Sequence, residues 1–599
     1  MKKSYSWLPA IVALLCGINA AGQEKNHEIN CSEYEEYILT HELTPVGPVP
    51  SVLDPNGVYP YMSYAETSNR PVLKKYKFVI LENERIRVTV CPDLGGKIFS
   101  IIHKGSGKEV LYVPDVIRYT RILPRFYFVA GGIEVSFPIS HSPTQNEKLL
   151  YKIDKTKDRI YVSCGERELR FGMQWTVEYS LGPDDNFLTQ RVKFFNPGTE
   201  AYPWMSWSNA AIPSGPDTKY HFPRGKVLSH ASTIDTIDWV TQGPKTERDI
   251  KEMTGFFWKT KDANAFGAYT PVMGTGLYHI ADEKIAGGIK LWSYGFGKDS
   301  NWAILSTAKH QPYVEIQGGP IADQSIKLEL KPKQTRWHVE YWIPTDKELD
   351  IYSLKVPPLT LRSIHEVPLF GWARNSEVKK WLALQQSSPV SIDPPAIEEC
   401  QWAPSGMENL DAGFKKMIKQ AGSHSQDLWK FYYGTWLAGR GREKEAIQVL
   451  TSTRNGLAQV VLARLQKKAG DMEGARKAFE RITEKWLQLH PQIVVERDKV
   501  LRGIGRSTIS DRENWLSMVN ALNDEWIIER RVQLLIDKDL YQEAKDLLLS
   551  THFQKIHQTY SRTGLWIQLC KKLNLPVDPI PAQLGEDKLA NFGAYREFE

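Results

Sequence analysis

The strongest constraint on the fold of this chain is a change of pattern near Thr345–Pro368. Before it, short runs of apolar and β-branched residues recur, separated by turns rich in Pro, Gly, Asn and Asp. After it, leucine and alanine recur at helical spacing. Many short strands predict a large antiparallel β sandwich, and the later pattern predicts a separate helical domain. At 599 residues the chain is too long for one core, which agrees with several domains.

The β part is expected to span residues 71–345. Lys77–Glu82 and Ile86–Val90 flank the turn residues Asn83-Glu84 and therefore predict a hairpin. Further strands are predicted at Ile98–Ile102, Gln174–Ser180, Gln190–Phe195, Gly287–Trp292 and Trp337–Trp342. We expect residues 23–70, which are proline-rich, to be irregular and to wrap over the sandwich, and residues 346–374 to form a linker.

The helical part, residues 375–599, shares one pattern at three places. A Gly or Asp turn is followed five residues later by an alanine in Gly441–Ala446, Gly470–Ala475 and Asp539–Ala544. The alanines are 29 and 69 residues apart, and the second interval is about twice the ~34-residue tetratricopeptide period. Small residues let paired helices approach closely, so we predict a tetratricopeptide-like solenoid. It either packs on the β domain or recruits a protein partner.

Charge and aromatic content narrow the function classes. The formal net charge of +6 is small against 76 basic and 70 acidic residues, and no basic tract stands out, which argues against a nucleic-acid partner. The chain holds 19 Trp, 26 Tyr and 21 Phe. Such a surplus fits sugar-stacking surfaces, and it also fits the cores of sandwiches and helical repeats.

The N-terminal segment predicts export. Lys2 and Lys3 precede an apolar run, Leu8–Ile18, and Ala20-Ala21-Gly22 offers a cleavage site, so residues 1–22 are expected to be a signal peptide. Leu15 precedes Cys16 where a lipoprotein would need a small residue. We therefore expect a periplasmic or outer-surface protein with no membrane span. The five later cysteines are sparse and lack CxxC spacing, which argues against a disulfide framework or zinc site.

One candidate for chemistry is the stretch Gln311–Gln324. Its strand pattern puts Glu315 and Gln317 on one face and apolar residues on the other, and Gly318-Gly319-Pro320 is expected to end the strand. An acid held rigidly beside a glycine turn that leaves space for a ligand suits proton transfer. The alternative is an edge strand with a solvated glutamate.

Three more segments complete the candidate set. Gly131–Pro143 holds Glu134 in a strand and His141 in a loop, and Trp204–Ala211 holds Trp207 and Asn209. The others are His279 in a strand and Asp323 after the glycine turn. Carboxylates, amides and indoles are suited to holding a carbohydrate.

Each candidate also has a structural interpretation. Glu134 could pair with a core arginine, His141 could bond a loop carbonyl, and His279 could be a satisfied core histidine. Asn209 could stabilise a turn, and Trp207 could belong to the core. The histidines lack metal-ligand spacing, so neither a metal nor another cofactor is expected.

In its motif order the chain resembles a bacterial domain family of unassigned activity. That family has a galactose mutarotase-like β-supersandwich, commonly followed by tetratricopeptide repeats. The motifs are DLGGKI (93–98), GGIEVSFPISHSP (131–143), WSNAA (207–211), GLYHIAD (276–282), VEIQGG (314–319) and EYWIP (340–344). Relatives tend to have two histidines and an arginine where this chain has Ser140-His141-Ser142. That departure predicts a missing basic contact to the ligand and a different substrate preference.

The resemblance implies two kinds of sugar chemistry. In mutarotase-like enzymes a glutamate base and a histidine acid open the ring, roles that would fall to Glu315 and to His141 or His279. Sugar-cleaving enzymes of the same architecture need two carboxylates, about 5–5.5 Å apart for retention or ~6.5–9.5 Å apart for inversion. Glu134 and Glu315 are the candidates for that pair, and Asp323 is an alternative carboxylate.

We therefore predict an exported carbohydrate-active enzyme, a glycoside hydrolase in which Glu134 and Glu315 share acid and base work and His141 assists. Trp207, Asn209, His279, Gln317 and Asp323 would bind the oligosaccharide or glycan. An aldose-1-epimerase-like enzyme and a non-catalytic glycan-binding scaffold are the alternatives. An assay of glycan turnover with the Glu315→Gln variant distinguishes the glycoside hydrolase, which should lose activity, from the non-catalytic scaffold, which should form no product at all.

Overall fold

The computed structural model describes most of the chain. The described ranges are 28–45, 60–61, 64–67, 70–123, 126–139, 141, 145, 147–231, 234–296, 311–323, 326–386, 392–397, 402–519, 524–553 and 561–584. The segment expected to be a signal peptide lies outside them.

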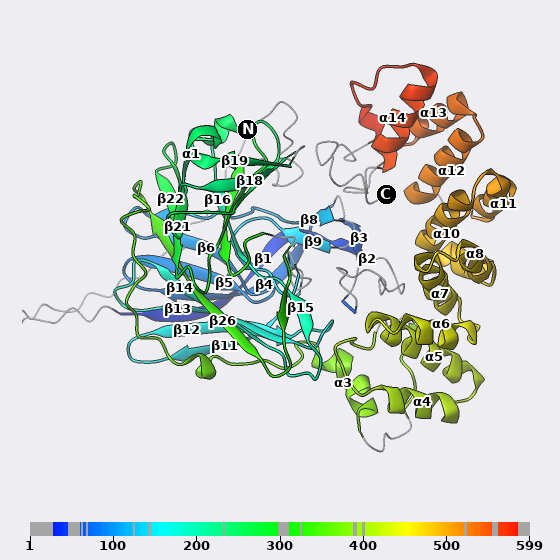
Figure 1. Ribbon diagram of the computed structural model, residues 1–599, viewed down its shortest axis with the longest axis horizontal. Helices are drawn as coiled ribbons and strands as arrows, with labels where there is room; N and C mark the ends of the chain where they lie inside the picture. The colour runs from blue at the N-terminus through cyan, green and yellow to red at the C-terminus, as the bar shows by residue number, and fades with distance from the viewer. Residues whose placement is uncertain are drawn as a thin grey trace, which may run out of the picture.

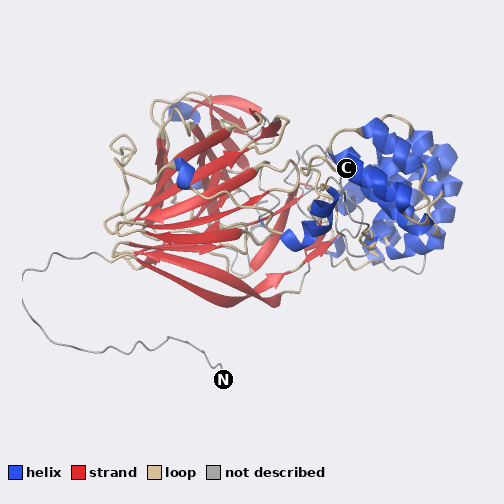
Figure 2. Cartoon of the chain, turned by 90° about the horizontal axis from the view of Figure 1, so that it is seen from below, coloured by secondary structure: helices blue, strands red, loops and turns tan. Residues whose placement is uncertain are grey.

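The N-terminal part is built from two large sheets (Figures 1 and 2). The larger sheet has the described order β19-β18-β20-β23-β24-β16-β10-β6-β5-β4-β1-β8-β9, with β7 on β6, and the smaller has the order β11-β12-β13-β14-β26-β22-β21-β17. Two short pairs, β15-β25 and β2-β3, complete the described strands.

The strands of the larger sheet are β1 (Asn30–His41), β4 (Val72–Glu82), β5 (Ile86–Cys91), β6 (Lys97–His103), β7 (Lys108–Glu109), β8 (Ile117–Leu123), β9 (Phe126–Val129), β10 (Ile133–Val135), β16 (Ser208–Pro213), β18 (Lys226–His230), β19 (Ile234–Asp238), β20 (Thr254–Trp258), β23 (Gly288–Ser293) and β24 (Tyr313–Gly319). The strands of the smaller sheet are β11 (Leu150–Lys155), β12 (Ile160–Arg167), β13 (Gln174–Leu181), β14 (Leu188–Phe195), β17 (Lys219–His221), β21 (Ala265–Thr270), β22 (Thr275–Ala281) and β26 (Thr335–Thr345). The short pairs are β2 (Leu43–Pro45) with β3 (Tyr64–Thr67) and β15 (Tyr202–Trp204) with β25 (Leu328–Leu330). A four-residue helix, α1 (Trp239–Gln242), and a 3-10 turn, η2 (Glu247–Asp249), lie between β19 and β20.

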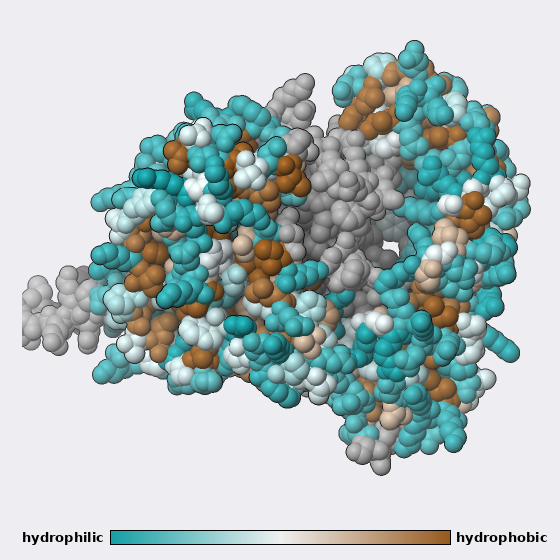
Figure 3. Space-filling view, in the orientation of Figure 1, coloured by the Kyte–Doolittle hydropathy of each residue, from teal (hydrophilic) through white to brown (hydrophobic). Residues whose placement is uncertain are grey.

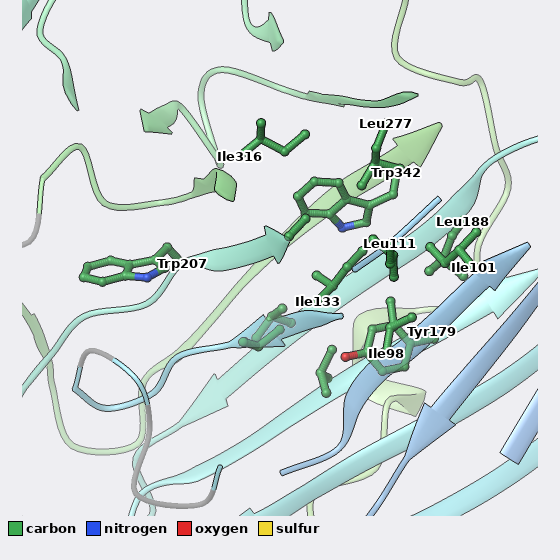
Figure 4. Packing of buried hydrophobic residues seen from close by; sticks show 14 of the residues in the cluster. Ile98, Ile101, Leu111, Ile133, Tyr179, Leu188, Trp207, Leu277, Ile316 and Trp342 are labelled. Carbon is green, nitrogen blue, oxygen red and sulfur yellow. The ribbon is translucent and has the colours of Figure 1, made fainter. Parts of the chain in front are cut away.

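The two sheets enclose one apolar core. Figure 4 shows Ile98, Ile133 and Ile316 of the larger sheet in the same cluster as Tyr179, Leu188 and Trp342 of the smaller sheet. These residues come from strands in which alternate side chains face inward, as the period of two requires. The predicted antiparallel β-supersandwich is confirmed, and of the described pairings only β1 with β8 is parallel.

The expectation of an irregular segment over residues 23–70 is wrong for its described part. Residues 30–41 form β1, which pairs with β4 from Asn30↔Glu82 to Thr40↔Val72. The strand was missed because most of its side chains are exposed, so its sequence lacks the apolar alternation of a half-buried strand. Its Tyr, Ile and Thr residues nevertheless favour extended backbone.

The C-terminal part is helical. Figure 1 shows its helices following one another in a curved array beside the sandwich. They are α3 (Asn375–Leu384), α4 (Asp411–Gln420), α5 (Ser423–Gly439), α6 (Glu443–Thr451), α7 (Gly456–Lys468), α8 (Met472–Glu480), α9 (Glu484–Leu489), α10 (Pro491–Ile504), α11 (Ile509–Met518), α12 (Glu525–Asp537), α13 (Tyr541–Ser550) and α14 (Ser561–Leu573), with 3-10 turns η5 (Arg506–Thr508) and η6 (Ala582–Leu584).

The turn-and-alanine pattern has the role that the sequence predicted. Gly441, Gly470 and Asp539 have φ of 75°, 83° and 63° and lie between α5 and α6, α7 and α8, and α12 and α13. A left-handed residue is a common way to end a helix, and glycine adopts it at least cost. Ala446, Ala475 and Ala544 are fully buried where the following helices pack, as a helical repeat requires.

The segment between the two parts lies along the smaller sheet. It contains the 3-10 turn η3 (Ile364–Glu366). The side chains of Gln174 and Thr176 on β13 donate to the carbonyls of Phe370 and Pro368, at 2.6 Å each. The helical part then contacts the sandwich directly, since Ser405 Oγ donates to the carbonyl of Arg170 at 2.7 Å. The repeats are therefore packed on the β domain, one of the two roles expected of them.

Figure 3 shows apolar residues dispersed among polar ones over the coloured surface of this face. The apolar sides of the repeat helices pack instead into a cluster that includes Trp381, Phe414, Trp429 and Trp436. No helix within the described ranges combines the length and the apolar character that a membrane crossing needs.

Candidate active site

Four adjacent strands of the larger sheet carry a row of polar side chains on the face away from the core. Glu134 of β10 lies opposite Asn209 of β16. Asn209 in turn lies opposite Gln317 of β24, and Gln317 opposite Lys290 of β23. Side chains opposite one another across strands share a face. The neighbouring residues point the other way, into the core: Ile133, Val135, Ala210, Val314, Ile316, Ile289 and Leu291.

Glu315 joins this row from the same strand as Gln317. Asn209 Nδ2 donates to Glu315 Oε2 at 2.9 Å, and Gln317 Nε2 donates to the same oxygen at 3.1 Å. β24 is paired on both sides, by β16 and β23, and Glu315 is buried. The alternative of an edge strand with a solvated glutamate is therefore wrong.

The second acid, Glu134, is held by a histidine and lies near a lysine. His141 Nδ1 lies 2.6 Å from Glu134 Oε1, and the backbone N–H of His141 donates to Ser136 Oγ at 3.0 Å. Lys97 precedes Ile98, which pairs with Ile133, so its buried side chain enters beside Glu134. Lys97 Nζ donates to the carbonyl of Val129 at 2.7 Å.

The double glycine before β10 allows this close packing. Gly131 and Gly132 have φ of 92° and 68°, which side chains disfavour. A Cβ at Gly132 would lie 2.0 Å from the carbonyl oxygen of Ile98, and one at Gly131 would lie 2.5 Å from that of Tyr112. Glycine is required here because β10 enters the sheet against the backbone of its neighbours.

The electrostatic surroundings shift the pKa values of Glu134 and Glu315 in opposite directions. For Glu134, burial acts to raise the pKa, but His141 and the charges of Lys97 and Lys290 together hold it below its ordinary value. For Glu315, burial and the nearby charge of Glu134 raise the pKa, although His141, Lys290 and Asn209 oppose them. The two environments therefore separate the pKa values, lowering that of Glu134 and raising that of Glu315.

Two lysines, Lys97 and Lys290, interact electrostatically with both acids. Burial lowers the pKa of Lys97, against the attraction of Glu134 and Glu315. Burial also lowers the pKa of Lys290 to about 8, again against both acids. With a pKa of about 8, Lys290 is mostly cationic at neutral pH, and the charges of both lysines act to lower the pKa of Glu134.

Three buried polar atoms near the acids lack a hydrogen-bond partner within the described part of the chain. They are Asn209 Oδ1, Gln317 Oε1 and Trp207 Nε1. The two amides use their N–H groups on Glu315, which leaves their oxygens as acceptors. Leaving buried polar atoms unbonded is costly, and ligand hydroxyl groups are suitable partners for two acceptors and a donor.

The two tryptophans near the row differ in what covers them. Trp207 is buried, and Lys290 Nζ lies over its ring at 5.2 Å from the centroid. Figure 4 shows it at the margin of the core cluster. Trp292 of β23 lies opposite Glu315 and is only half-buried, with its ring 6.1 Å from that of Tyr313. Trp292 therefore offers the more accessible aromatic surface beside the acids.

His279 lies behind the row, between the two sheets. Its Nε2 is 3.0 Å from Glu340 Oε1, and its ring stacks on that of Phe266 at 4.5 Å. A Cβ at Gly318 would lie 2.7 Å from His279 Nε2. The space left by the glycine turn is thus filled by protein rather than held for a ligand, and β24 continues through Gly319.

Asp323 lies beyond the end of β24 and forms an ion pair with Lys259, which follows β20. The structure therefore gathers Glu134, His141, Asn209, Glu315 and Gln317, with Trp207 beneath Lys290. It places His279 between the two sheets, in contact with Glu340, and pairs Asp323 with Lys259.

Lys97, Lys290 and Trp292 belong to the site and were not predicted. Lys290 and Trp292 alternate in the strand sequence GIKLWS, so the pattern put them on one face, and the register of the strands sets them opposite Gln317 and Glu315. A lysine in a strand is usually solvated, which is why the signal was passed over. No group of three or more His, Cys, Asp or Glu side chains in the described residues is arranged to hold a metal ion.

Comparison with known proteins gives two family matches. The family described as "Domain of unknown function (DUF5107)" matches residues 53–345, and a family described as a C-terminal domain matches residues 379–569. These two matches cover the sandwich and the helical repeats separately.

Solved structures extend the comparison to the whole chain. A TPR-domain containing protein from Parabacteroides distasonis is 63% identical, with a TM-score of 0.88 over 94% of this chain and 98% of that chain. A galactose mutarotase-like protein from Clostridium acetobutylicum is 14% identical, with a TM-score of 0.34 over 45% of this chain and 95% of that chain. One from Lactobacillus casei is 11% identical, with a TM-score of 0.33 over 45% and 99%.

Proposed function

This chain belongs to the family of the Parabacteroides TPR-domain protein, with a DUF5107 domain before its helical repeats, and we propose that it is a carbohydrate-active enzyme that cleaves a glycosidic bond. Glu315 acts as the general acid and Glu134 as the base or nucleophile. His141 holds Glu134 in its charged form.

The observation that carries the proposal is the pair of acids with opposite proton preferences on one face. Glycosidases need one carboxyl group that keeps its proton and one that is ionised, and different surroundings produce that division. Burial raises the pKa of Glu315, while His141 at 2.6 Å helps to hold the pKa of Glu134 below its ordinary value. The two acids lie on β24 and β10, on either side of β16, and their separated pKa values support this division of roles.

The surroundings of the acids support a sugar as the ligand. The acceptor oxygens of Asn209 and Gln317 and the N–H of Trp207 suit hydroxyl groups, and the half-buried ring of Trp292 suits the apolar face of a pyranose. His279 and Asp323 are not assigned to this ligand.

The test is glycan hydrolysis by Glu315→Gln, Glu134→Gln and the wild type. Loss of a general acid or base costs about 10²–10⁴-fold in rate, so both variants should lose nearly all release of reducing ends. Glu329→Gln is the control, because Glu329 is exposed on β25. Undiminished turnover by Glu315→Gln would refute the assignment.

The second candidate is an aldose-1-epimerase-like enzyme. The contact between His141 Nδ1 and Glu134 Oε1 favours it, since ring opening needs one group to take the anomeric proton and another to protonate the ring oxygen. Polarimetry on free sugars distinguishes it, because anomers would interconvert without new reducing ends. Sugar binding with neither new reducing ends nor anomer interconversion would instead support a glycan-binding scaffold.

The proposal includes export and a docking role for the repeats. The signal-like residues 1–22 support export of the enzyme. Outside the cytoplasm, polymeric glycans would be its substrates. The repeats pack on the sandwich through Ser405 and its neighbours, and a protein partner on their remaining surface is a prediction.

A further inference from the structure

His141, which contacts Glu134, lies in a segment that runs between the two parts of the protein. Phe137 belongs to the core of the sandwich, where its ring stacks on that of Phe194 at 4.4 Å. Ile139, two residues later, is buried instead in the apolar cluster of the helical part. The chain therefore passes from one core to the other immediately before His141.

The cluster around Ile139 joins the two parts. It contains Tyr61 and Leu169 from the first part of the chain together with Trp372, which lies just before α3. The backbone N–H of Leu169 donates to Tyr61 Oη at 3.1 Å, and the backbone N–H of Gly406 donates to the carbonyl of Leu169 at 3.0 Å. Ile139 is thus packed in an interface whose other side belongs to the C-terminal part.

An ion pair holds the same segment on the other side of His141 in the chain. Glu147 pairs with Arg374, the N-cap residue of α3, and the two side chains are only 15% and 19% exposed. The guanidinium of Arg374 also lies over the ring of Tyr61, 5.8 Å from its centroid. Ile139 and Glu147 therefore connect both flanks of His141 to the C-terminal part.

The backbone of His141 needs such support. Its φ is 47°, a left-handed conformation that costs free energy for a residue other than glycine and persists where the surrounding structure imposes it. In this conformation its N–H donates to Ser136 Oγ at 3.0 Å, and its Nδ1 lies 2.6 Å from Glu134 Oε1. The contact with the acid thus depends on what holds the segment.

We propose that the C-terminal part sets the contact between His141 and Glu134, with Ile139, Glu147 and Arg374 as positioning residues. This role rests on the proposed function of the site and gives the helical part a share in it. Loosening either flank should then weaken the contact between the imidazole and the carboxylate.

The other charged groups around Glu134 are attached differently. Lys97 lies on β6, Lys290 on β23 and Glu315 on β24, all strands of the larger sheet, and each interacts with Glu134. His141 lies outside these strands, in the segment that the C-terminal part holds. A looser His141 should therefore let the pKa of Glu134 rise toward its ordinary value while the two lysines keep their effect.

Two substitutions of opposite charge separate position from electrostatics. Arg374→Met and Glu147→Gln both break the ion pair. Through charge alone, loss of the cation would raise the pKa of Glu134, and loss of the anion would lower it. If the pair positions His141, both variants should instead raise it. The acid limb of kcat/KM for glycan hydrolysis should then move to higher pH by about one unit in both.

Uncharged substitutions test the other flank. Ile139→Ala should move the acid limb in the same direction, whereas Ile139→Val, which removes one methylene group, should keep it close to the wild-type position. Glu200→Gln is the matched control for Glu147→Gln. Glu200 pairs with Arg440, which follows α5, at 3.1 Å, so this ion pair also joins the two parts but lies outside the His141 segment. It should leave the limb in place.

The ring of His141 gives a second readout that needs no turnover. Histidine labelled with ¹³C at Cε1 is observed by NMR, and the His141 signal is identified by its loss in His141→Asn. Because the ring contacts Glu134, its chemical shift should follow the ionisation of that acid, at higher pH in Arg374→Met and Glu147→Gln than in the wild type. Near-UV circular dichroism checks that each variant is folded, which the isosteric Glu147→Gln is expected to be.

The outcomes separate this inference from the proposed function. Folded Arg374→Met and Glu147→Gln whose acid limb and His141 signal stay at wild-type values, or move in opposite directions, would overturn it, as would an equal shift in Glu200→Gln. If such a result comes while Glu315→Gln abolishes hydrolysis, only the positioning role fails. If the wild type releases no reducing ends but the His141 signal responds as expected, the positioning contact stands and the proposed hydrolysis fails.

Discussion

The two faces of strands β16 and β24 carry polar clusters of opposite character. On the outer face, Asn209, Glu315 and Gln317 form a group whose amide oxygens have no protein partner within the described residues. On the inner face, Ser208 Oγ donates to Glu340 Oε2, and Gln190 Nε2 donates to the same oxygen at 3.0 Å. Adjacent residues of one strand, Ser208 and Asn209, thus serve different clusters.

The inner cluster is closed by two histidines that contact Glu340. Glu340 is fully buried, with His279 Nε2 3.0 Å from Oε1 and His338 Nε2 3.2 Å from Oε2. Burial acts to raise the pKa of Glu340, but the two histidines hold it well below its ordinary value. Glu315 is also buried, yet its pKa is raised. The contacts of Glu340 thus lower its pKa, whereas the surroundings of Glu315 raise its pKa, as the proposed role of general acid requires.

The largest effect should come from breaking the inner cluster. Glu340→Ala leaves two histidines, Gln190 and Ser208 buried without their shared partner, and each buried polar group left unsatisfied costs about 1–3 kcal/mol. Glu315→Gln should leave stability unchanged or raise it, because burial already disfavours the charge that the amide removes. Thermal unfolding followed by near-UV circular dichroism measures both. Equal losses of stability would contradict the division between the faces.

The pH dependence of hydrolysis should follow the outer pair. The proposed mechanism needs Glu134 ionised and Glu315 protonated, so activity should fall as the pH drops below the lowered pKa of Glu134 and as the pH rises through the raised pKa of Glu315. Each limb should fall about tenfold per pH unit. Lys290 favours the ionised form of Glu315, so Lys290→Gln should move the alkaline limb to higher pH. Glu329→Gln should move neither limb, and limbs unmoved by Lys290→Gln would contradict this coupling.

Much of the scaffold was predictable from local pattern. Val314 and Ile316 alternate with Glu315 and Gln317, and the period of two put the polar pair on one face, as the structure has it. The turn-and-alanine segments predicted the helical repeat, because a left-handed turn and a small buried residue are requirements that a short sequence can show.

The arrangement of the site was less accessible from sequence. β24 meets β16, and β16 meets β10, through pairings between segments far apart in the chain, so no local signal fixed which residues would join Glu315. His279 and Glu340 lie in apolar strands whose sequence does not show that they contact each other. Lys290 was passed over because a strand lysine usually reaches solvent, and only its register opposite Gln317 reveals its place.

The smallest predicted effect compares aromatic rings on the same outer face. Trp292 is half-buried opposite Glu315, whereas Trp207 is buried beneath Lys290. Loss of an aromatic contact costs about 0.5–1.5 kcal/mol beyond its area, so Trp292→Ala should raise KM up to about tenfold with a smaller change in kcat. Trp337→Ala is the control, because Trp337 is an exposed tryptophan on β26 of the other sheet. If Trp292→Ala leaves KM unchanged while Trp207→Phe raises it, the indole beneath the lysine contacts the sugar, and the accessible ring of Trp292 does not.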